Sequence, residues 1–297
     1  MKAPSMKSID LDSASARLEH LRADEVHFEK LAHILKDLAG INLAKTPKNM
    51  SLMAARLARL FEKHGIDSYG TFLQQLQGGR GPLVEEFISA MTTNTTEFFR
   101  ESRHFEQLSH MLPGYLKERR NGDTPEIRVW CAASSSGQEV YSLLITLLES
   151  EPSLTEWNLK MLATDIDLNM LDRASLGMYT ESEVTGIPPL YRQKYFTQQK
   201  VGQSTKFVVT PQLRNFVTFA PFNLMTESYP FRHPFDIVFC RNVLIYFDRE
   251  TATTVTERIA QVIRPAGFLV VGHSEVGLVK SSTFASEASA FYRKIRS

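Results

Sequence analysis

The stretch Phe235-Asp-Ile-Val-Phe-Cys-Arg-Asn-Val-Leu-Ile-Tyr-Phe-Asp248 decides how the rest of this chain is interpreted. Its first part, Phe235 to Cys240, is apolar and rich in strand formers, which is typical of a strand covered on both faces. Polar and aromatic side chains follow within eight positions, namely Arg241, Asn242, Tyr246 and Asp248. Ligands of open parallel sheets bind at the carboxyl ends of strands, so this segment is a candidate site. Taken alone, it is interpreted equally well as a polar loop that caps the next helix.

The composition is that of a soluble globular protein. The chain has 297 residues, 43% of them hydrophobic and 23% charged, enough for one large or two ordinary domains. A formal net charge of +1 gives no general case for nucleic-acid binding. No apolar run approaches the roughly 20 residues that span a bilayer, and the polar start lacks a signal-peptide core. With only Cys131 and Cys240 present, we expect a cytoplasmic protein without disulfides.

The pattern of the first third of the chain predicts a small helical domain. We expect a flexible segment over residues 1–24 and a helical domain over 25–90, with apolar residues at three- and four-residue spacing. The expected helices run to Gly40, to His64-Gly65, over Tyr69 to Leu76 and over Leu83 to Met91. Between Val26 and Arg80 there are eight Lys or Arg and four acids. This charge indicates either a solvated face or a docking surface for an acidic partner.

The rest of the chain alternates strands with helices. We expect a linker and lid segment over 91–125, with a helix and turn over 104–124, and an α/β domain over 126–297. Strands are predicted over 127–132, 159–165, 235–240, 268–272 and 290–295, and helices over 139–148, 168–176 and 251–263. This order predicts a parallel, doubly wound sheet. Residues 180–222 interrupt this alternation of strands and helices, and the runs 206–210 and 216–219 predict a small antiparallel insertion. We found no metal-spaced His/Cys cluster and expect no metal.

The first strand of this domain ends in Cys131-Ala-Ala-Ser-Ser-Ser-Gly-Gln-Glu139. Small residues between a strand and a helix let the backbone approach a ligand closely. The run is neither the G-x-G-x-x-G dinucleotide fingerprint nor a P-loop, which favours a nucleoside with a tail smaller than a phosphate chain. Glu139 is interpreted as a helix cap or as an acceptor for a ligand amine.

The second strand ends in Ala163-Thr-Asp-Ile-Asp167. A carboxylate at this position can accept both hydroxyl protons of a ribose. Either acid could instead cap the following helix. We assign Asp165 to the ribose and Asp167 to capping.

A polar segment, Met91-Thr-Thr-Asn-Thr-Thr-Glu-Phe-Phe-Arg100, precedes the α/β domain. One interpretation is a capping segment that starts a helix near Glu97. The other is a lid, in which hydroxyl and amide groups hold polar ligand atoms and Arg100 holds a carboxylate.

Together, these motifs resemble one known family. The set comprises Thr93 to Arg100, Trp130 to Glu139, Ala163 to Asp167, Phe239 to Asp248 and Gly272-His-Ser-Glu275, in this order. It strongly resembles the bacterial chemotaxis receptor methyltransferases (CheR) over about residues 26–297. The resemblance implies methyl transfer from S-adenosylmethionine to glutamate side chains of chemoreceptors, giving methyl esters and S-adenosylhomocysteine. It also implies a helical N-terminal domain and a Rossmann-like methyltransferase domain with an inserted β subdomain.

The resemblance also assigns roles to residues. It implies that Arg100 and Tyr246 lie nearest the transferring methyl group and are catalytic. It implies cofactor contacts at Asn94, Thr96, Arg100, Glu139, Asp165, Asn223, Leu224, Cys240 and Arg241. The implied partners are receptor cytoplasmic helices, and we expect a monomer without membrane insertion or nucleic acid. The turn around Gln199 to Ser204 is shorter than in the members that grip a receptor tail peptide.

A glutamate acceptor is ionised at neutral pH, since its unperturbed pKa is about 4.3, so no general base is required. We expect the enzyme to align the groups and exclude water, and we expect His273 to fix a strand end rather than move protons. Two alternatives stay open. One is a methyltransferase for nucleic acid or a small molecule, although the Asn/Asp-Pro-Pro-Tyr run is absent after Cys240. The other is a scaffold that binds S-adenosylmethionine without transferring its methyl group.

Overall fold

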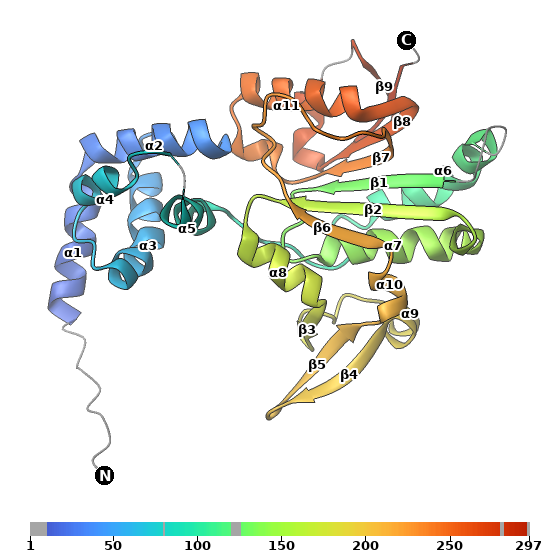
Figure 1. Ribbon diagram of the computed structural model, residues 1–297, viewed down its shortest axis with the longest axis horizontal. Helices are drawn as coiled ribbons and strands as arrows, with labels where there is room; N and C mark the ends of the chain where they lie inside the picture. Colours follow the sequence, from blue (N-terminus) through green and yellow to red (C-terminus); the bar gives the residue numbers. More distant parts are fainter. Residues whose placement is uncertain (1–10, 80, 120–125, 280–281, 296–297) are drawn as a thin grey trace. The chain divides into compact units, whose positions relative to one another are not determined.

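The computed structural model describes residues 11–79, 81–119, 126–279 and 282–295. The chain divides into two compact units, residues 1–92 and 93–297 (Figure 1). The predicted turn at Asn121-Gly-Asp123 lies outside the described residues. The structure groups the whole polar segment from Thr93 onward with the second unit. No helix of the described ranges combines the length and the apolar character needed to cross a bilayer.

The first unit is a helical domain. Its helices are α1 Leu11–Ala23, α2 Glu25–Ala39, α3 Pro47–His64, α4 Tyr69–Gln75 and α5 Pro82–Met91. The helix ends follow local chemistry: Thr46 caps α3 ahead of Pro47, and Gly40 and Gly65 end α2 and α3 in the left-handed conformation. Buried phenylalanines fill the core, with the Phe72 ring centroid 5.0 Å from that of Phe61 and 5.3 Å from that of Phe87. The four predicted helices of this domain are confirmed.

The expectation of a flexible segment over residues 1–24 is wrong for the part that the structure describes. Leu11–Ala23 forms helix α1, which packs against α3. The side chain of Leu21 is buried, and Leu18, one helical turn earlier, is partly buried. Two apolar residues three positions apart are enough to anchor one face of an otherwise polar helix once α3 provides a surface. Residues 1–10 lie outside the described ranges.

A mixed seven-stranded sheet forms the centre of the second unit (Figure 1). Its strands, in spatial order, are β6 Val217–Pro221, β2 Asn158–Asp165, β1 Glu126–Ala132, β7 Phe235–Cys240, β8 Ile263–Val271, β10 Phe291–Lys294 and β9 Phe284–Ala288. The first five are parallel to one another, which confirms the predicted parallel arrangement of β2, β1, β7 and β8 and adds β6 to it. The predicted last strand, β10, runs antiparallel to β8 and to β9. The short β9–β10 turn accounts for the pairing with β9, because such a turn can join only antiparallel strands.

Helices pack on both faces of this sheet. On one face, α6 Arg103–Arg119 and α7 Gln138–Ser150 share a core with β1 and β7. On the other face, α11 Arg249–Val262 packs through Val255 and Ile259 onto Val238 and Trp130. The remaining helices are α8 Leu168–Leu176, α9 Pro189–Tyr195, α10 Pro211–Arg214 and the short 3₁₀ helices η1 Pro152–Thr155, η2 Leu244–Tyr246 and η3 His273–Leu278. The α/β fold with helices on both faces is therefore confirmed.

The antiparallel insertion exists but ends earlier than predicted. It consists of β3 Met178–Thr180, β5 Ser204–Val209 and β4 Phe196–Val201, in that spatial order. A tight turn with Gly202 at φ +62° joins β4 to β5. The assignment of Phe216 to Phe219 to this insertion is wrong. Residues 217–219 belong to β6, which pairs in parallel with β2, because Phe216 and Phe219 pack against the main core.

Candidate active site

The carboxyl ends of three neighbouring strands, β2, β1 and β7, lie side by side. Ala132 at the end of β1 is in register with Thr164 on β2 and with Cys240 on β7. The motifs that follow these strands in sequence are therefore neighbours in space. This edge of the sheet is where ligands bind in open α/β folds.

Asp165 lies at the end of β2 with both carboxylate oxygens held by backbone amides. Ser135 N donates to Oδ2 at 2.7 Å, and Asp167 N donates to Oδ1 at 2.9 Å. Burial raises the pKa of Asp165, and these amide hydrogen bonds oppose the rise. Each oxygen of a carboxylate has two acceptor positions, so a second donor, such as a sugar hydroxyl, can still be accepted. The environment fits the predicted ribose contact.

Asp167 has the predicted capping role. Its Oδ1 accepts from Asn169 N at the start of α8, at 3.1 Å. Its Oδ2 accepts from Asn94 Nδ2 at 2.8 Å, and Ser135 Oγ donates to the Asn94 carbonyl at 3.2 Å. The polar segment that contains Asn94 is therefore attached to the ends of β1 and β2.

Glu139 forms an ion pair with Arg241. Its Oε2 accepts from Arg241 Nη1 at 2.6 Å, and its Oε1 accepts from Cys131 Sγ at 3.3 Å. The interpretation of Glu139 as a helix cap is wrong, since the residue before α7 is Gly137 and no side-chain cap bond is made there. The predicted contact of Glu139 with the cofactor stays a prediction.

Arg241 ties β7 to the segment that was predicted to be a lid. Its side chain is completely buried and donates from Nη2 to the Arg100 carbonyl at 2.7 Å and to Glu101 Oε2 at 3.0 Å. The guanidinium carbon lies 5.5 Å from the centroid of the Phe105 ring. Arg241 thus joins Glu139 on α7 to the backbone of Arg100.

The segment before Arg100 is irregular. The interpretation that a helix starts near Glu97 is wrong, because the next helix, α6, begins at Arg103. Arg100 is partly exposed and donates from Nη1 to the Thr95 carbonyl at 2.7 Å, and Thr96 between them is half-buried. These observations fit the lid interpretation.

Asn223 and Leu224 follow β6 and lie beside the end of β2. The neighbouring Phe222 N donates to the Asp165 carbonyl at 3.0 Å. Asn223 Oδ1 accepts from Met225 N at 2.9 Å, and the Leu224 carbonyl accepts from Tyr229 Oη at 2.9 Å. The segment with the expected cofactor contacts Asn223 and Leu224 therefore adjoins the expected ribose carboxylate.

Sequence reasoning missed Glu275 as an organiser of the site. This carboxylate is fully buried at the start of η3 and accepts from Gly272 N at 2.6 Å, Asn242 N at 2.8 Å and Ile245 N at 3.3 Å. It thereby fixes the turn after β7 in which Tyr246 is half-buried and in which Asn242 has φ +58°. The available signal was the Gly272-His-Ser-Glu275 motif after a strand. Cys240, at the end of β7, is fully buried.

One group of side chains has the composition of a metal site. Among the described residues, ligand atoms of Glu101, His104 and His273 lie within 4.8 Å of one another. However, Glu101 already accepts from Arg241, and a guanidinium this close opposes a divalent cation. The main-chain amide of His273 also donates to Glu101 Oε2 at 3.4 Å, so the group serves to join η3 to the residue after Arg100.

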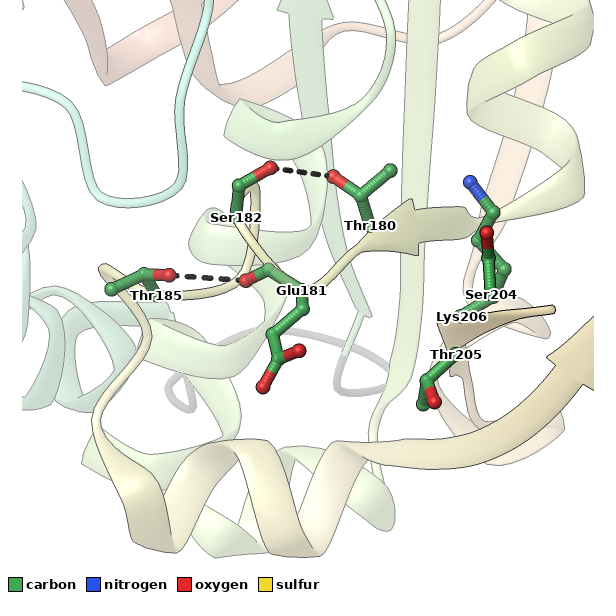
Figure 2. A pocket seen from close by; sticks show the side chains of 7 residues that line it. All are labelled: Thr180, Glu181, Ser182, Thr185, Ser204, Thr205 and Lys206. Atoms are coloured by element: carbon green, nitrogen blue, oxygen red, sulfur yellow. Dashed lines mark hydrogen bonds between the residues drawn. The ribbon is translucent and has the colours of Figure 1, made fainter.

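A separate pocket of about 550 Å³ lies on the antiparallel insertion (Figure 2). Its lining is polar, and none of the predicted site residues belongs to it: Thr180, Glu181, Ser182, Thr185, Ser204, Thr205 and Lys206. Two hydrogen bonds within the chain hold the lining, at 3.0 Å between the Thr180 and Ser182 hydroxyls and at 3.0 Å from Thr185 Oγ1 to the Glu181 carbonyl.

The second unit is a doubly wound α/β domain with a candidate ligand site at its strand ends, and it follows an all-α domain in the sequence. Residues 94–291 match the CheR methyltransferase SAM-binding domain, and residues 26–92 match the CheR methyltransferase all-alpha domain. The chain belongs to the CheR methyltransferase family.

The alignments with known relatives extend over most of this chain and over most of each relative. The chain is 38% identical over 239 residues to a probable chemotaxis protein methyltransferase of Rhizobium etli. The aligned region covers 80% of this chain and 87% of the relative. It is 36% identical to the chemotaxis protein methyltransferases of Salmonella typhimurium and Escherichia coli, with 86% of each chain covered in both comparisons.

Proposed function

We propose that this protein transfers a methyl group from S-adenosylmethionine to glutamate side chains of chemoreceptors and forms methyl esters. The observation that carries the proposal is the Arg241 bridge, which joins Glu139 on α7 to the Arg100 carbonyl and so assembles the lid over the strand ends. Membership of the CheR methyltransferase family and the similarity to chemotaxis protein methyltransferases support it. We further propose a cytoplasmic monomer that acts on receptor cytoplasmic helices.

The side chains at this edge of the sheet fit the cofactor. Asp165 is a carboxylate acceptor for ribose hydroxyls, and Arg100 is a cation for the carboxylate of the amino-acid tail. Ser134 Oγ is buried at the end of β1 without a hydrogen-bond partner among the described residues, which suits a polar ligand. The remaining proposed contacts are Asn94, Thr96, Glu139, Asn223, Leu224, Cys240 and Arg241. The bound cofactor supplies an electrophilic methyl group on a sulfonium.

The work of the protein is alignment rather than proton transfer. A glutamate acceptor is already ionised at neutral pH, because its unperturbed pKa is about 4.3. Arg100 orients the acceptor carboxylate without neutralising it, and Tyr246 shapes the space around the methyl group. Replacing Arg100 with Ala removes this alignment, and we expect turnover to be lost.

The helical unit is the proposed receptor-docking part. Over the whole unit, residues 1–92, its 12 Lys or Arg exceed its 11 Asp or Glu by one, so the basic surplus is confined to the stretch between Val26 and Arg80. Lys45 pairs with Glu25 and Glu29, and Arg56 donates to the carbonyls of Met91 and Thr92. The remaining basic side chains include Lys30 on α2, which lines a groove between α2 and α4.

The experiment that tests the function uses methyl-labelled S-adenosylmethionine and membranes that carry the chemoreceptors of the same organism. We expect label on the receptor band and release of volatile methanol after mild alkali, which is characteristic of methyl esters. Alkali-stable label would indicate a methyltransferase of another substrate class. Cofactor binding with no transfer to any receptor would indicate a scaffold.

A further inference from the structure

Arg100 lies between two residues with unusual backbone geometry. Phe99 has φ +56° and Glu101 has φ +58°, values that are unfavourable for residues other than glycine. Such a conformation persists only where surrounding groups hold it. On the Phe99 side, the amide donates to Ser142 Oγ on α7 at 2.9 Å, and the ring packs against Phe105.

On the other side, the Glu101 carboxylate holds the segment. Its Oε2 accepts from Arg241 Nη2 at 3.0 Å, and its Oε1 accepts from Asn242 Nδ2 at 3.2 Å. The His273 amide donates to Oε2 at 3.4 Å. Glu101 therefore connects the residue after Arg100 to the turns that follow both β7 and β8.

The same guanidinium nitrogen serves Arg100 and Glu101. Arg241 Nη2 donates to the Arg100 carbonyl at 2.7 Å as well as to Glu101. Arg241 is completely buried, so its charge requires the two carboxylates, Glu139 and Glu101, that flank it. Burial would raise the pKa of Glu101, but the hydrogen bonds from Arg241 and Asn242 outweigh it and lower the pKa to about 2. The carboxylate is therefore ionised at any working pH.

We infer that Glu101 is a positioning residue that fixes the backbone of Arg100, and so the direction of the Arg100 side chain toward the cofactor and the acceptor. The inference rests on the role of Arg100 in the proposed function. Glu101 itself is directed at Arg241, Asn242 and the His273 amide, so it acts through Arg100 and has no direct part in the chemistry.

The test is a double-variant comparison of S-adenosylhomocysteine affinity, measured by calorimetry on the full chain. Glu101→Gln keeps the size of the side chain but leaves one acceptor oxygen and no charge. We expect it to weaken S-adenosylhomocysteine binding about fivefold and to lower kcat on receptor about tenfold or more. In an Arg100→Ala background, we expect the same substitution to change the affinity by less than about twofold, because the side chain it positions is gone.

The matched control is Glu106→Gln, which removes a charge from the exposed face of α6 and is expected to leave affinity and kcat unchanged. Thermal melting shows whether the fold is kept. If Glu101→Gln melts well below the parent, Glu101→Asp takes its place in the same comparison.

The outcomes separate this inference from the proposed function. Equal losses of affinity on both backgrounds, or none on either, would overturn the positioning role of Glu101. If Arg100→Ala itself kept full affinity and full turnover, the proposed role of Arg100 would fail instead, and the inference with it. Loss with Arg100→Ala but not with Glu101→Gln would overturn the inference alone.

Discussion

At the residue scale, the site depends on carboxylates that are buried without a neutralising lysine. Asp165 relies on two backbone amides, and Glu275 relies on three. Amide donors stabilise the charged form while leaving the remaining acceptor positions open. In contrast, Glu139 and Glu101 share a buried arginine, which makes them parts of the framework. Asp165 is the carboxylate proposed to accept ribose hydroxyls, whereas Glu275 holds a turn and Glu139 and Glu101 hold Arg241.

The environment of Asp165 predicts a pH dependence of cofactor binding. Burial raises the pKa of Asp165, and only the ionised form accepts two hydroxyl protons. S-adenosylhomocysteine affinity should therefore fall as pH decreases through this raised pKa. Asp165→Asn should bind about tenfold more weakly at neutral pH and lack this pH dependence. Asp172→Asn, on the exposed face of α8, is the control, and an unchanged affinity for Asp165→Asn would contradict the ribose role.

The buried His104 predicts a pH dependence of stability. Burial, followed by the charges of Arg241 and His273, lowers the pKa of His104 to about 4, although Glu101 opposes this. The unfolded chain takes up this proton near pH 6.5 and the folded chain only near pH 4. The free energy of unfolding should therefore decrease by about 3 kcal/mol as pH falls across this window.

Chemical denaturation at pH 7 and pH 4.5 measures this effect. His104→Gln should show a smaller loss of stability over the same interval, while the exposed His110→Gln should behave like the parent. An identical pH response in His104→Gln would show that His104 is not the titrating group.

At the element scale, strong local signals were predictable and long-range pairings were not. Asp167 was assigned correctly because a cap depends only on the residues that follow it. The Arg241 contacts with Glu101 and Glu139 join residues separated by 140 and 102 positions, so they cannot be predicted from a local sequence pattern. Phe216 and Phe219 were placed in the wrong sheet for the same reason, since the sequence pattern of a strand does not determine which strand it pairs with. β9 was missed because its residues are mostly exposed and carry no alternating apolar pattern.

The turn after β7 predicts a large effect of Glu275. Its carboxylate satisfies the backbone amides of Gly272, Asn242 and Ile245 in a buried position. A glutamine offers only one acceptor oxygen and brings an NH₂ group against those donors. Glu275→Gln should therefore lower the free energy of unfolding by about 2–3 kcal/mol and also reduce turnover, since Tyr246 follows this turn.

Denaturation and single-turnover methylation measure the two effects. Glu250→Gln, at the exposed start of α11, removes an equal charge without this contact and is the control. A Glu275→Gln protein with the stability and activity of the parent would contradict the organising role.

At the scale of the whole molecule, the proposed chemistry and the proposed receptor docking fall in two different compact units. The α/β unit carries every proposed cofactor contact, and the basic stretch between Val26 and Arg80 lies in the helical unit. Attraction between exposed charges is screened within about 8 Å at physiological ionic strength, so receptor methylation should decrease with added salt. Binding of S-adenosylhomocysteine, held by buried groups, should depend on salt much less.

Charge reversal on the helical unit tests this separation. Lys30→Glu on α2 should lower kcat/KM for the receptor several-fold at low salt, and the difference should shrink as salt rises. The matched control is Lys117→Glu, which places the same change on the exposed surface of α6. Equal behaviour of the two variants would argue against docking through α2.

The measurement that tests the central claim most directly is peptide mass spectrometry of receptor incubated with the protein and S-adenosylmethionine. The account predicts methyl groups on glutamate side-chain carboxylates of the receptor, formed by the parent protein and by Glu106→Gln but not by Arg100→Ala. Methyl groups on nitrogen-bearing side chains, or methylation of glutamate that persists in Arg100→Ala, would contradict it.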